Sequence, residues 1–440
     1  MNFFKKIFSP TILMTSLFFL AYTFYSSEIY WNGEKQNYYF TYYVLSLILI
    51  FFSIITFFIK QKIKEYLVIS VISTVMSLYL FEGYVTYKKY LNEKLFEKQK
   101  GEKWDRRSRV EIYEDLKKLN NEITMVFFPG NHLNKNDPIF SLSGVSNTET
   151  IFCNENGYYS IYQSDRYGFN NPNDSWDKKE IEYLLVGDSF THGACVNRPN
   201  DIASILRTLS SKSVLNLGYN GNSSLIEYAT LREYLNPNVK KVLWIYYEGN
   251  DLKDLLNEKN DKVLINYLNN LDFTQNLKLR QNEINDLSIK LIEKERKAER
   301  KSEKVKNKTI LKRFIKLSNV RFLTFPSKSP PPEFKKILEL TKKLTVKNNS
   351  KLYFVYLPEK HRYKKKYDNT NYILVKDIVS KLDIPFIDIH KEVIEKEGNL
   401  KKLFPIGFRG HYSVKGYKKI AETIYKLTKD KNEQTKYKFE

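Results

Sequence analysis

The sequence contains little of what metal sites and cross-linked scaffolds need. Its 440 residues include two cysteines and five histidines. Two cysteines exclude a disulfide-dense scaffold and a zinc module built from several cysteines, and five histidines leave few ligands for a metal cluster. The 16 glycines and 13 prolines are too few for a collagen-like or other fibrous chain. We therefore expect neither a metal nor a cofactor.

Apolar and basic residues, by contrast, are plentiful. Hydrophobic residues make up 42% of the chain and aromatic residues 15%, which excludes a disordered chain. The formal net charge is +22 because 72 Lys and Arg face 50 Asp and Glu. Lysine is spread along the chain with Asn, Ile and Tyr, as a composition bias of the source genome produces, and we expect no nucleic-acid partner. A basic exterior would still attract anionic polysaccharide or lipid head groups.

Three apolar runs occupy the first 90 residues. They cover about residues 7–26, 39–59 and 66–87, and each reaches the ~20 residues that span a bilayer core. We predict a transmembrane region over residues 1–90. The first run follows Lys5 and Lys6, so a cleaved signal peptide is the alternative to an uncleaved helix; we favour the helix because no small-x-small cleavage pattern follows.

The distribution of lysine predicts the orientation of these helices. Lys5 and Lys6 precede the first run, residues 27–38 hold a single lysine, and residues 60–65 hold three. Because cytoplasmic flanks carry the excess of Lys and Arg, the third crossing would deliver the rest of the chain to the extracytoplasmic, periplasmic side. Cleavage of the first run would give the same side. Lysines just after residue 87 argue the other way, but a long domain translocates largely regardless of its charge.

The sequence between residues 91 and 178 predicts a connector followed by short strands. Residues 91–109 are rich in charge and fit a helical connector. Residues 110–177 alternate short apolar pieces with Asn-Gly and Asn-Pro turn signals. We expect this region to pack on the domain that follows.

After Lys179 the chain alternates strands and helices. Short apolar runs predict strands at residues 183–186, 213–216, 241–247, 351–357 and 385–389. Helix-length segments lie at residues 201–210, 223–234, 333–346, 371–382 and 413–427. This alternation predicts an α/β domain over residues 179–435, with a parallel sheet covered on both faces.

Four polar turns follow these strands or open the last helix. They span residues 187–193, 216–223, 248–251 and 410–413. Because sites in such sheets lie at the carboxyl ends of the strands, we expect the four turns at one rim.

These blocks, in this order, resemble the SGNH/GDSL hydrolase family, and the resemblance covers about residues 182–428. It implies a flavodoxin-like, three-layer α/β/α domain and a membrane-linked member of the family. It also implies that Ser189 is the nucleophile and His411 the base. Gly221 and Asn250 would complete an oxyanion hole with the backbone N–H of Ser189. A serine hydroxyl needs such a base, and the tetrahedral intermediate needs such donors.

One position departs from the family pattern. The family places an aspartate three residues before the histidine, and Phe408 stands there in this sequence. Three replacements are open: a Ser-His dyad without an acid, an orienting backbone carbonyl, or a carboxylate from elsewhere such as Asp388.

Cys153 and Cys195 are the two cysteines, and Cys195 lies six residues after Ser189. In an oxidising compartment a bridge between them would tie the short-strand region to the catalytic helix, and we favour that bridge over two separately buried thiols.

Other polar residues fit structural roles. We expect His192 to be solvated on the first helical turn, with contact to substrate as the alternative. We expect Asp188 and Asp251 to hold their turns through backbone hydrogen bonds. We interpret the three remaining histidines as surface or packing residues, namely His132, His361 and His390. By the resemblance, residues 165–171 pack beside the site.

A long insertion separates the third and fourth strands, at about residues 252–332. Residues 277–292 and 310–323 have apolar positions at helical spacing, whereas residues 293–308 are highly charged and fit a solvated helix. We expect a helical excursion above the site that forms a solvated hairpin or a face for anionic lipid; a substrate lid is the alternative.

Two functions follow from the sequence. The first is a membrane-anchored, outward-facing serine esterase or O-acyltransferase that acts on acylated envelope carbohydrate through an acyl-serine intermediate. The alternative is a catalytically inactive SGNH scaffold that binds envelope polysaccharide. Both assignments of substrate rest on family analogy.

Overall fold

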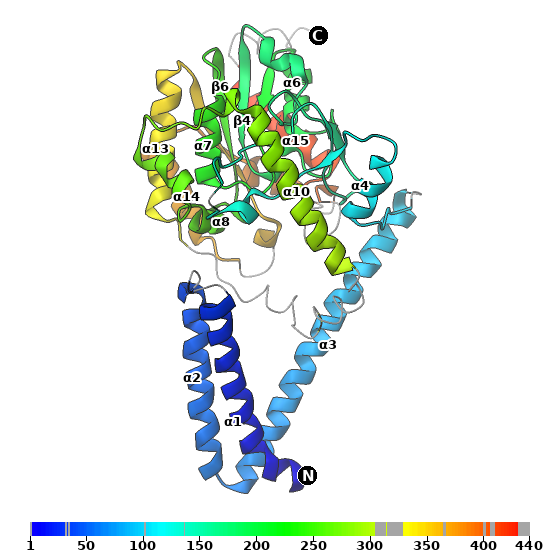
Figure 1. The fold of residues 1–440 in the computed structure, drawn as a ribbon, viewed down its shortest axis with the longest axis vertical. Helices are drawn as coiled ribbons and strands as arrows, with labels where there is room; N and C mark the ends of the chain where they lie inside the picture. The colour runs from blue at the N-terminus through cyan, green and yellow to red at the C-terminus, as the bar shows by residue number, and fades with distance from the viewer. Residues whose placement is uncertain are drawn as a thin grey trace. The chain divides into compact units, whose positions relative to one another are not determined.

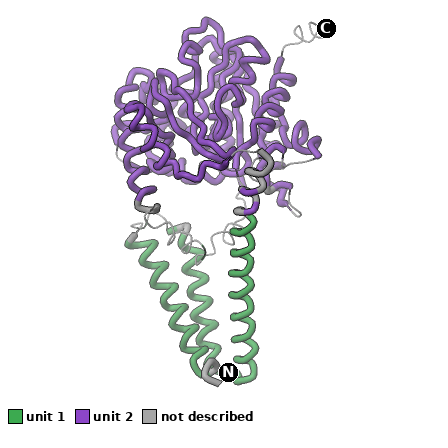
Figure 2. The backbone as a smooth tube through the Cα atoms, turned by 90° about the vertical axis from the view of Figure 1, so that its right-hand side faces the viewer, with its two compact units in different colours: residues 1–88, 310–324 green, residues 89–309, 325–440 purple. Residues whose placement is uncertain are grey.

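The protein is described by a computed structural model. It describes residues 2–30, 33, 36–100, 103–135, 137–303, 314, 329–363, 367–398, 402–404 and 410–429. The chain divides into two compact units, residues 1–88 with 310–324 and residues 89–309 with 325–440 (Figure 2).

The first unit consists of long apolar helices. Its helices are α1 (Asn2–Phe24), α2 (Gln36–Phe58) and α3 (Gln61–Lys100), and the part of α3 from Lys89 belongs to the second unit (Figure 1). Three segments, Lys6–Ile29, Tyr39–Phe58 and Gln61–Lys88, are long and apolar enough to cross a membrane. A one-turn π-helix, η1 (Tyr25–Tyr30), extends α1. Helices α1 and α2 pack together, and the Ser9 hydroxyl donates to the carbonyl of Thr56 at 3.0 Å. Most apolar side chains of these helices are exposed, as expected of a surface that faces lipid.

The second unit is built on a five-stranded parallel sheet. Its strands are β4 (Ile181–Gly187), β5 (Val214–Asn216), β6 (Val239–Tyr247), β7 (Lys351–Leu357) and β8 (Phe386–Asp388). They lie in the order β5-β4-β6-β7-β8, and every pair is parallel. This 2-1-3-4-5 order is the flavodoxin-like one, and it confirms the predicted fold class.

Helices cover both faces of this sheet. Successive strand residues point to opposite faces: Leu184 and Val186 join the core under α7 (Ser224–Tyr234) and α13 (Pro332–Lys347), whereas Tyr183 and Leu185 join the core under α6 (Ile202–Ser210) and α15 (Val414–Thr428). Helix α14 (Thr370–Lys381) adds Val375 and Val379 to the first of these cores. The arrangement is a three-layer α/β/α sandwich.

Residues 103–178 form an irregular layer that shares the first core. It contains α4 (Arg109–Lys117) and a small sheet of β1 (Thr124–Met125), β2 (Glu149–Ile151) and β3 (Ile161–Gln163). Short 3-10 turns, η2 (Pro129–His132) and η3 (Asn173–Asp177), complete it. Ile151, Phe127 and Phe169 are buried in the same cluster as the α7 face of the main sheet. This layer is therefore part of the body that carries the site.

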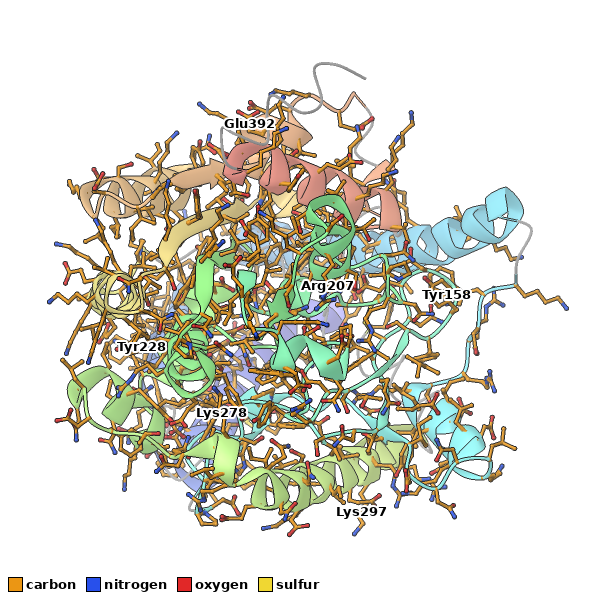
Figure 3. All side chains as sticks on the ribbon, turned by 90° about the horizontal axis from the view of Figure 1, so that it is seen from above. Tyr158, Arg207, Tyr228, Lys278, Lys297 and Glu392 are labelled. Carbon is orange, nitrogen blue, oxygen red and sulfur yellow. A yellow bond between two sulfur atoms is a disulfide. The ribbon has the colours of Figure 1, made fainter. Side chains whose placement is uncertain are left out.

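The described part of the insertion up to residue 303 is mainly helical, as predicted. It contains α8 (Asp251–Glu258), α9 (Lys262–Asn269), η4 (Leu277–Leu279) and α10 (Gln281–Glu303). The expectation of a solvated helix from residue 293 is wrong for one face of α10: Glu295 accepts hydrogen bonds from the Phe128 N–H and from Asn131, whereas Lys297 points outward (Figure 3). The predicted segment 310–323 lies outside the described residues except for Phe314.

The remaining turns complete the rim of the sheet. They are η5 (Lys360–Tyr363) after β7 and η6 (His390–Ile394) after β8. Arg207 of α6 reaches inward, and its Nη2 donates to the carbonyl of Val214 and to Asn171 Oδ1 (Figure 3). It thereby joins α6, β5 and the segment before β4.

Candidate active site

The serine turn follows the central strand β4. Asp188 caps the short helix α5 (Ser189–His192) by accepting the N–H of Phe190 at 2.9 Å. Gly187 permits the close packing of this turn, because a Cβ there would lie 2.1 Å from Thr191 Oγ1 and 2.6 Å from the carbonyl oxygen of Ile245. The sheet and the cap together fix the backbone that presents Ser189.

Ser189 and His411 come together across 222 residues of sequence. His411 Nε2 lies 2.8 Å from Ser189 Oγ. His411 precedes α15, whose N-cap Ser413 accepts the N–H of Gly416, so that the start of α15 fixes the imidazole beside α5. This is the hydrogen-bond reach that a base needs in order to take the proton of a serine hydroxyl.

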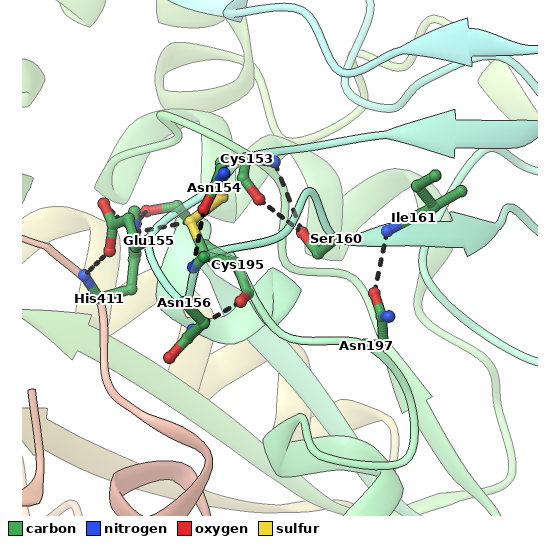
Figure 4. The surroundings of a disulfide bond; sticks show 12 residues. Cys153, Asn154, Glu155, Asn156, Ser160, Ile161, Cys195, Asn197 and His411 are labelled. Atoms are coloured by element: carbon green, nitrogen blue, oxygen red, sulfur yellow. Dashed lines mark hydrogen bonds and ion pairs between the residues drawn. A yellow bond between two sulfur atoms is a disulfide. The ribbon is translucent and has the colours of Figure 1, made fainter. Parts of the chain in front are cut away.

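Glu155 supplies a carboxylate to the other side of the imidazole. Its Oε1 lies 3.2 Å from His411 Nδ1, and its Oε2 accepts the backbone N–H of His411 at 2.5 Å (Figure 4). Gly410 allows this approach, because its φ is +130° and a Cβ there would lie 2.5 Å from Oε2 of Glu155. Ser189, His411 and Glu155 therefore form a continuous hydrogen-bonded chain.

The sequence did not identify Glu155. Asp388, named as an example of a distant acid, is not the partner: it accepts the Tyr372 hydroxyl at 2.6 Å and the N–H of Lys391 at 3.3 Å. Phe408, at the family's aspartate position, lies outside the described residues. The one available signal was the predicted cysteine bridge, which brings residues around Cys153 to the helix that begins at Ser189.

Glu155 and His411 carry opposite charges, so each shifts the pKa of the other: that of Glu155 falls and that of His411 rises. Burial raises the pKa of the Glu155 carboxyl, but the charge and hydrogen bonds of His411 outweigh it and leave that pKa lowered. Burial lowers the pKa of His411, and Glu155, with a smaller contribution from Asp188, more than offsets it and raises that pKa above its ordinary value. Each partner favours the charged form of the other, so an imidazolium is stabilised at this position.

Gly221 and Asn250 lie at the ends of the strands that flank β4. Asn250 is the N-cap of α8 after β6, and its Nδ2 donates to Asp254 Oδ2 at 3.2 Å. Asn250 also lowers the pKa of the Asp188 carboxyl, although burial has the larger effect and raises that pKa to about 7. Gly221 follows β5 and has φ +75°, and a Cβ there would lie 1.9 Å from the Phe128 ring. Their role as oxyanion donors stays a prediction.

Cys153 and Cys195 are joined by a disulfide (Figure 4). Cys195 Sγ lies 3.8 Å from His411 Nδ1, so the bridge lies directly beside the imidazole. Both sulfur atoms and a ring nitrogen of His411 lie within 4.8 Å of one another. Disulfide sulfurs lack the charge of the thiolates that bind metals, and this grouping does not offer a thiolate site.

His192 is buried, and the expectation of a solvated residue is wrong. Its ring stacks on Tyr219 at 5.1 Å between centroids and lies 4.5 Å from the ring of Phe152. Burial lowers its pKa to about 3, which keeps the ring neutral. His192 therefore packs the back of the serine turn.

Residues 165–171 support that turn from behind. The buried Asp165 accepts the N–H groups of Tyr167 and Phe169. Asn170 Nδ2 donates to the carbonyl of His192, and Asn171 Nδ2 donates to the carbonyl of Asn216. The segment thus joins the end of α5 to the end of β5.

The other polar residues have structural contacts. Asp251 accepts the N–H of Tyr247 at 2.8 Å and so holds its turn as expected. His132 is buried, and His390 Nδ1 lies 2.9 Å from the Tyr363 hydroxyl. The side chain of His361 lies outside the described part of the chain.

The second unit is thus a flavodoxin-like α/β domain in which the side chains of Ser189, His411 and Glu155 lie within hydrogen-bond reach of one another in that order. No family model and no curated protein matches the sequence. Two solved structures are similar, a G-D-S-L family protein from Desulfitobacterium hafniense DCB-2 and the acetyl xylan esterase AlAXEase. The first has 12% identity and a TM-score of 0.31 and covers 56% of this chain and 99% of its own. The second has 12% identity and a TM-score of 0.31 and covers 57% and 100%. At this level of likeness nothing follows about the activity of this chain.

Proposed function

We propose that this protein is a membrane-anchored, outward-facing serine esterase or O-acyltransferase that acts on acylated carbohydrate of the cell envelope. The single observation that carries the chemistry is the 2.8 Å contact between Ser189 Oγ and His411 Nε2, with Glu155 at 3.2 Å from Nδ1. A serine hydroxyl, an imidazole and a carboxylate in this order are the parts of a charge-stabilised general base.

The proposed reaction begins with proton transfer from Ser189 to His411. Oγ attacks the ester carbonyl carbon while Nε2 takes its proton, and the carbonyl oxygen becomes an oxyanion. The backbone N–H groups of Ser189 and Gly221 and the Asn250 amide would donate hydrogen bonds to that oxygen. Collapse of the intermediate breaks the bond to the leaving oxygen, which receives the proton from Nε2, and an acyl-serine remains.

The second half of the reaction decides between hydrolase and transferase. Water or a sugar hydroxyl gives its proton to Nε2 and attacks the acyl carbon, and Ser189 leaves with that proton. Glu155 contributes at both stages, because an acceptor at Nδ1 holds the proton there and leaves Nε2 free as the base. The same carboxylate stabilises the imidazolium that forms each time.

The apolar helices support the location and the substrate. Three segments could cross a membrane, and an anchored enzyme remains close to envelope polymers that cannot diffuse to it. The lysine pattern of the short flanks favours an extracytoplasmic domain, and a disulfide persists in such a compartment.

Covalent labelling tests the proposed chemistry. A fluorophosphonate probe should label the full-length protein, and Ser189→Ala should abolish the label. Ser210→Ala is the matched control, because the Ser210 hydroxyl donates to the carbonyl of Leu206 within α6 and should not affect labelling. No labelling of the native protein would contradict the enzyme and favour an inactive scaffold that binds envelope polysaccharide.

A further inference from the structure

The loop that carries Glu155 is fastened on both sides of that residue. Cys153 is bonded to Cys195, and Asn156 Nδ2 donates to the carbonyl of Cys195 at 2.8 Å (Figure 4). Asn154 Nδ2 donates to the carbonyl of Asp105 at 2.8 Å. The disulfide is the covalent fastening, and it joins this loop to the segment that follows α5.

Glu155 has to be held because it comes from outside the α/β layers. The carboxylate that a serine triad needs stands two residues from Cys153, whereas Ser189 and His411 are positioned by the sheet and its helices. The side chain of Glu155 is one-fifth exposed, so water competes with His411 for its oxygens. The placement of the acid therefore depends on the loop, and the bridge is the covalent part of what holds that loop.

We propose that the Cys153–Cys195 disulfide is a redox-sensitive positioning device that holds Glu155 on His411, so that reduction by a dithiol lowers the efficiency of the base. This inference rests on the proposed function of the site. Glu155 and the two cysteines act through His411 and are positioning residues, because none of them touches the ester.

The redox step needs a dithiol and two electrons. Cys153 is half-buried and Cys195 is fully buried, so the thiolate of the reductant would attack Sγ of Cys153. A mixed disulfide forms as the bond to Cys195 breaks, and the Cys195 thiolate takes a proton. The second thiol of the reductant then attacks the mixed disulfide and becomes oxidised, and Cys153 leaves as a thiol. The net change is two protein thiols and one disulfide on the reductant.

Loss of the bridge should change the pH dependence as well as the rate. Glu155 and Asp188 raise the pKa of His411, and Lys360 lowers that of Glu155. The buried His192 nearby is neutral, and the charge of His411 lowers its pKa further. Glu155 is the largest of the influences that raise the pKa of His411, and burial opposes it. When Glu155 moves away, the pKa of His411 falls, and a rate that needs the neutral imidazole is retained to lower pH.

The experiment measures fluorophosphonate labelling of the full-length protein in detergent as a function of pH. For the oxidised protein, the rate should rise with pH through a midpoint above the ordinary histidine value of about 6.5. Dithiothreitol should lower the plateau rate about tenfold or more and move the midpoint to lower pH. The Cys153→Ser/Cys195→Ser variant should behave like the reduced protein, and if it does not fold, the dithiothreitol-treated native protein carries the test.

Glu155→Gln separates positioning from general support of the fold. Even when oxidised, this variant should be labelled slowly and have the lower pH midpoint. Dithiothreitol should change neither its labelling rate nor its midpoint. A further loss on reduction in Glu155→Gln would overturn the inference, since the bridge would then act through something other than Glu155. Unchanged rate and midpoint on reduction of the native protein would overturn it as well, and would leave the proposed function standing. Absence of labelling in the oxidised native protein overturns both.

Discussion

At the scale of single residues, the site depends on which carboxylate meets the imidazole. Glu155 does so with both oxygens, one to the Nδ1 side of the ring and one to the backbone N–H of the same residue. Asp188, adjacent to Ser189, instead caps α5. The burial that raises the pKa of Asp188 to about 7 makes it a poor permanent negative charge. The two carboxyls thus have separate tasks, one electrostatic and one conformational.

Asn250→Ala should lower kcat about 10²–10³-fold with little change in KM, equivalent to roughly 3–4 kcal/mol of transition-state stabilisation. The reason is that a donor to the oxyanion acts on charge that develops only in the transition state. Steady-state hydrolysis of an activated ester by both proteins would measure it.

Asp254→Ala is the control for that prediction. It removes the 3.2 Å hydrogen bond from Asn250 Nδ2 and leaves the amide itself in place. Equal losses in the two variants would mean that Asn250 works only by bonding Asp254, and the oxyanion role would be wrong.

The residues of the candidate site differ in how far the sequence predicts their positions. That Ser189 and His411 lie close together could be predicted, because one follows a recognisable strand, the other opens a helix, and the sheet brings those ends to one rim. Their roles follow from the family resemblance and stay predictions. Glu155 could not, because it lies in an irregular layer whose path depends on one disulfide and on hydrogen bonds such as Asn154 to Asp105. His192 was misjudged because the aromatic rings that bury it, Phe152 and Tyr219, come from other segments.

At the scale of elements, α10 connects the insertion to the rim of the site. Glu295 of α10 accepts the N–H of Phe128 at 3.0 Å, and its other oxygen pairs with Arg109 at 3.3 Å. The ring of Phe128 lies against Gly221, whose missing side chain leaves room for it. Glu295 thereby supports Phe128, which packs on the turn after β5.

Glu295→Ala should reduce the free energy of unfolding by about 1–3 kcal/mol, because it leaves the Phe128 N–H without its acceptor and removes one of the two carboxylates that pair with Arg109. Denaturant titration in detergent would measure the loss. The labelling rate of Ser189 should fall in the same variant.

Glu299→Ala provides the comparison. Glu299 contacts the same Arg109 at 2.6 Å but is 38% exposed, so its removal should cost about 0–1 kcal/mol and leave labelling unchanged. If Glu299→Ala lost as much free energy of unfolding and labelling rate as Glu295→Ala, the contact of Glu295 with Phe128 would not explain the loss.

Elements were the most predictable part of this protein. The five main strands and their helices could be located within a few residues, because short branched and aromatic runs in a parallel sheet are buried on both faces. The packed face of α10 could not be predicted, because it is formed by charged residues. Glu295 and Arg296 find their partners on the segment after β1 and on α4. The spacing of apolar residues identifies the apolar face of a helix, but it does not identify a face that packs through ion pairs.

At the scale of the whole molecule, an apolar helical unit and a basic α/β unit belong to one chain. Three segments of 24, 20 and 28 residues are long and apolar enough to cross a bilayer. The lysine pattern predicts the side on which the second unit lies, and the domain boundaries near residues 90 and 178 also stay predictions. The side matters chemically, because the disulfide beside His411 is stable only where the surroundings are oxidising.

Variants with one introduced cysteine should reveal that side. Both native cysteines are in the disulfide, so a maleimide reacts only with an introduced thiol. Lys418→Cys replaces a side chain that is 66% exposed on α15, and Lys62→Cys replaces an exposed residue at the start of α3. In cells with an intact inner membrane and a permeable outer layer, a membrane-impermeant maleimide should label Lys418→Cys before lysis and Lys62→Cys only after it.

The reverse pattern would place the α/β unit in the cytoplasm, where envelope carbohydrate is out of reach and the disulfide would be reduced. Both the proposed substrate and the positioning of Glu155 would then have to be abandoned, even if Ser189 reacted with the probe in vitro.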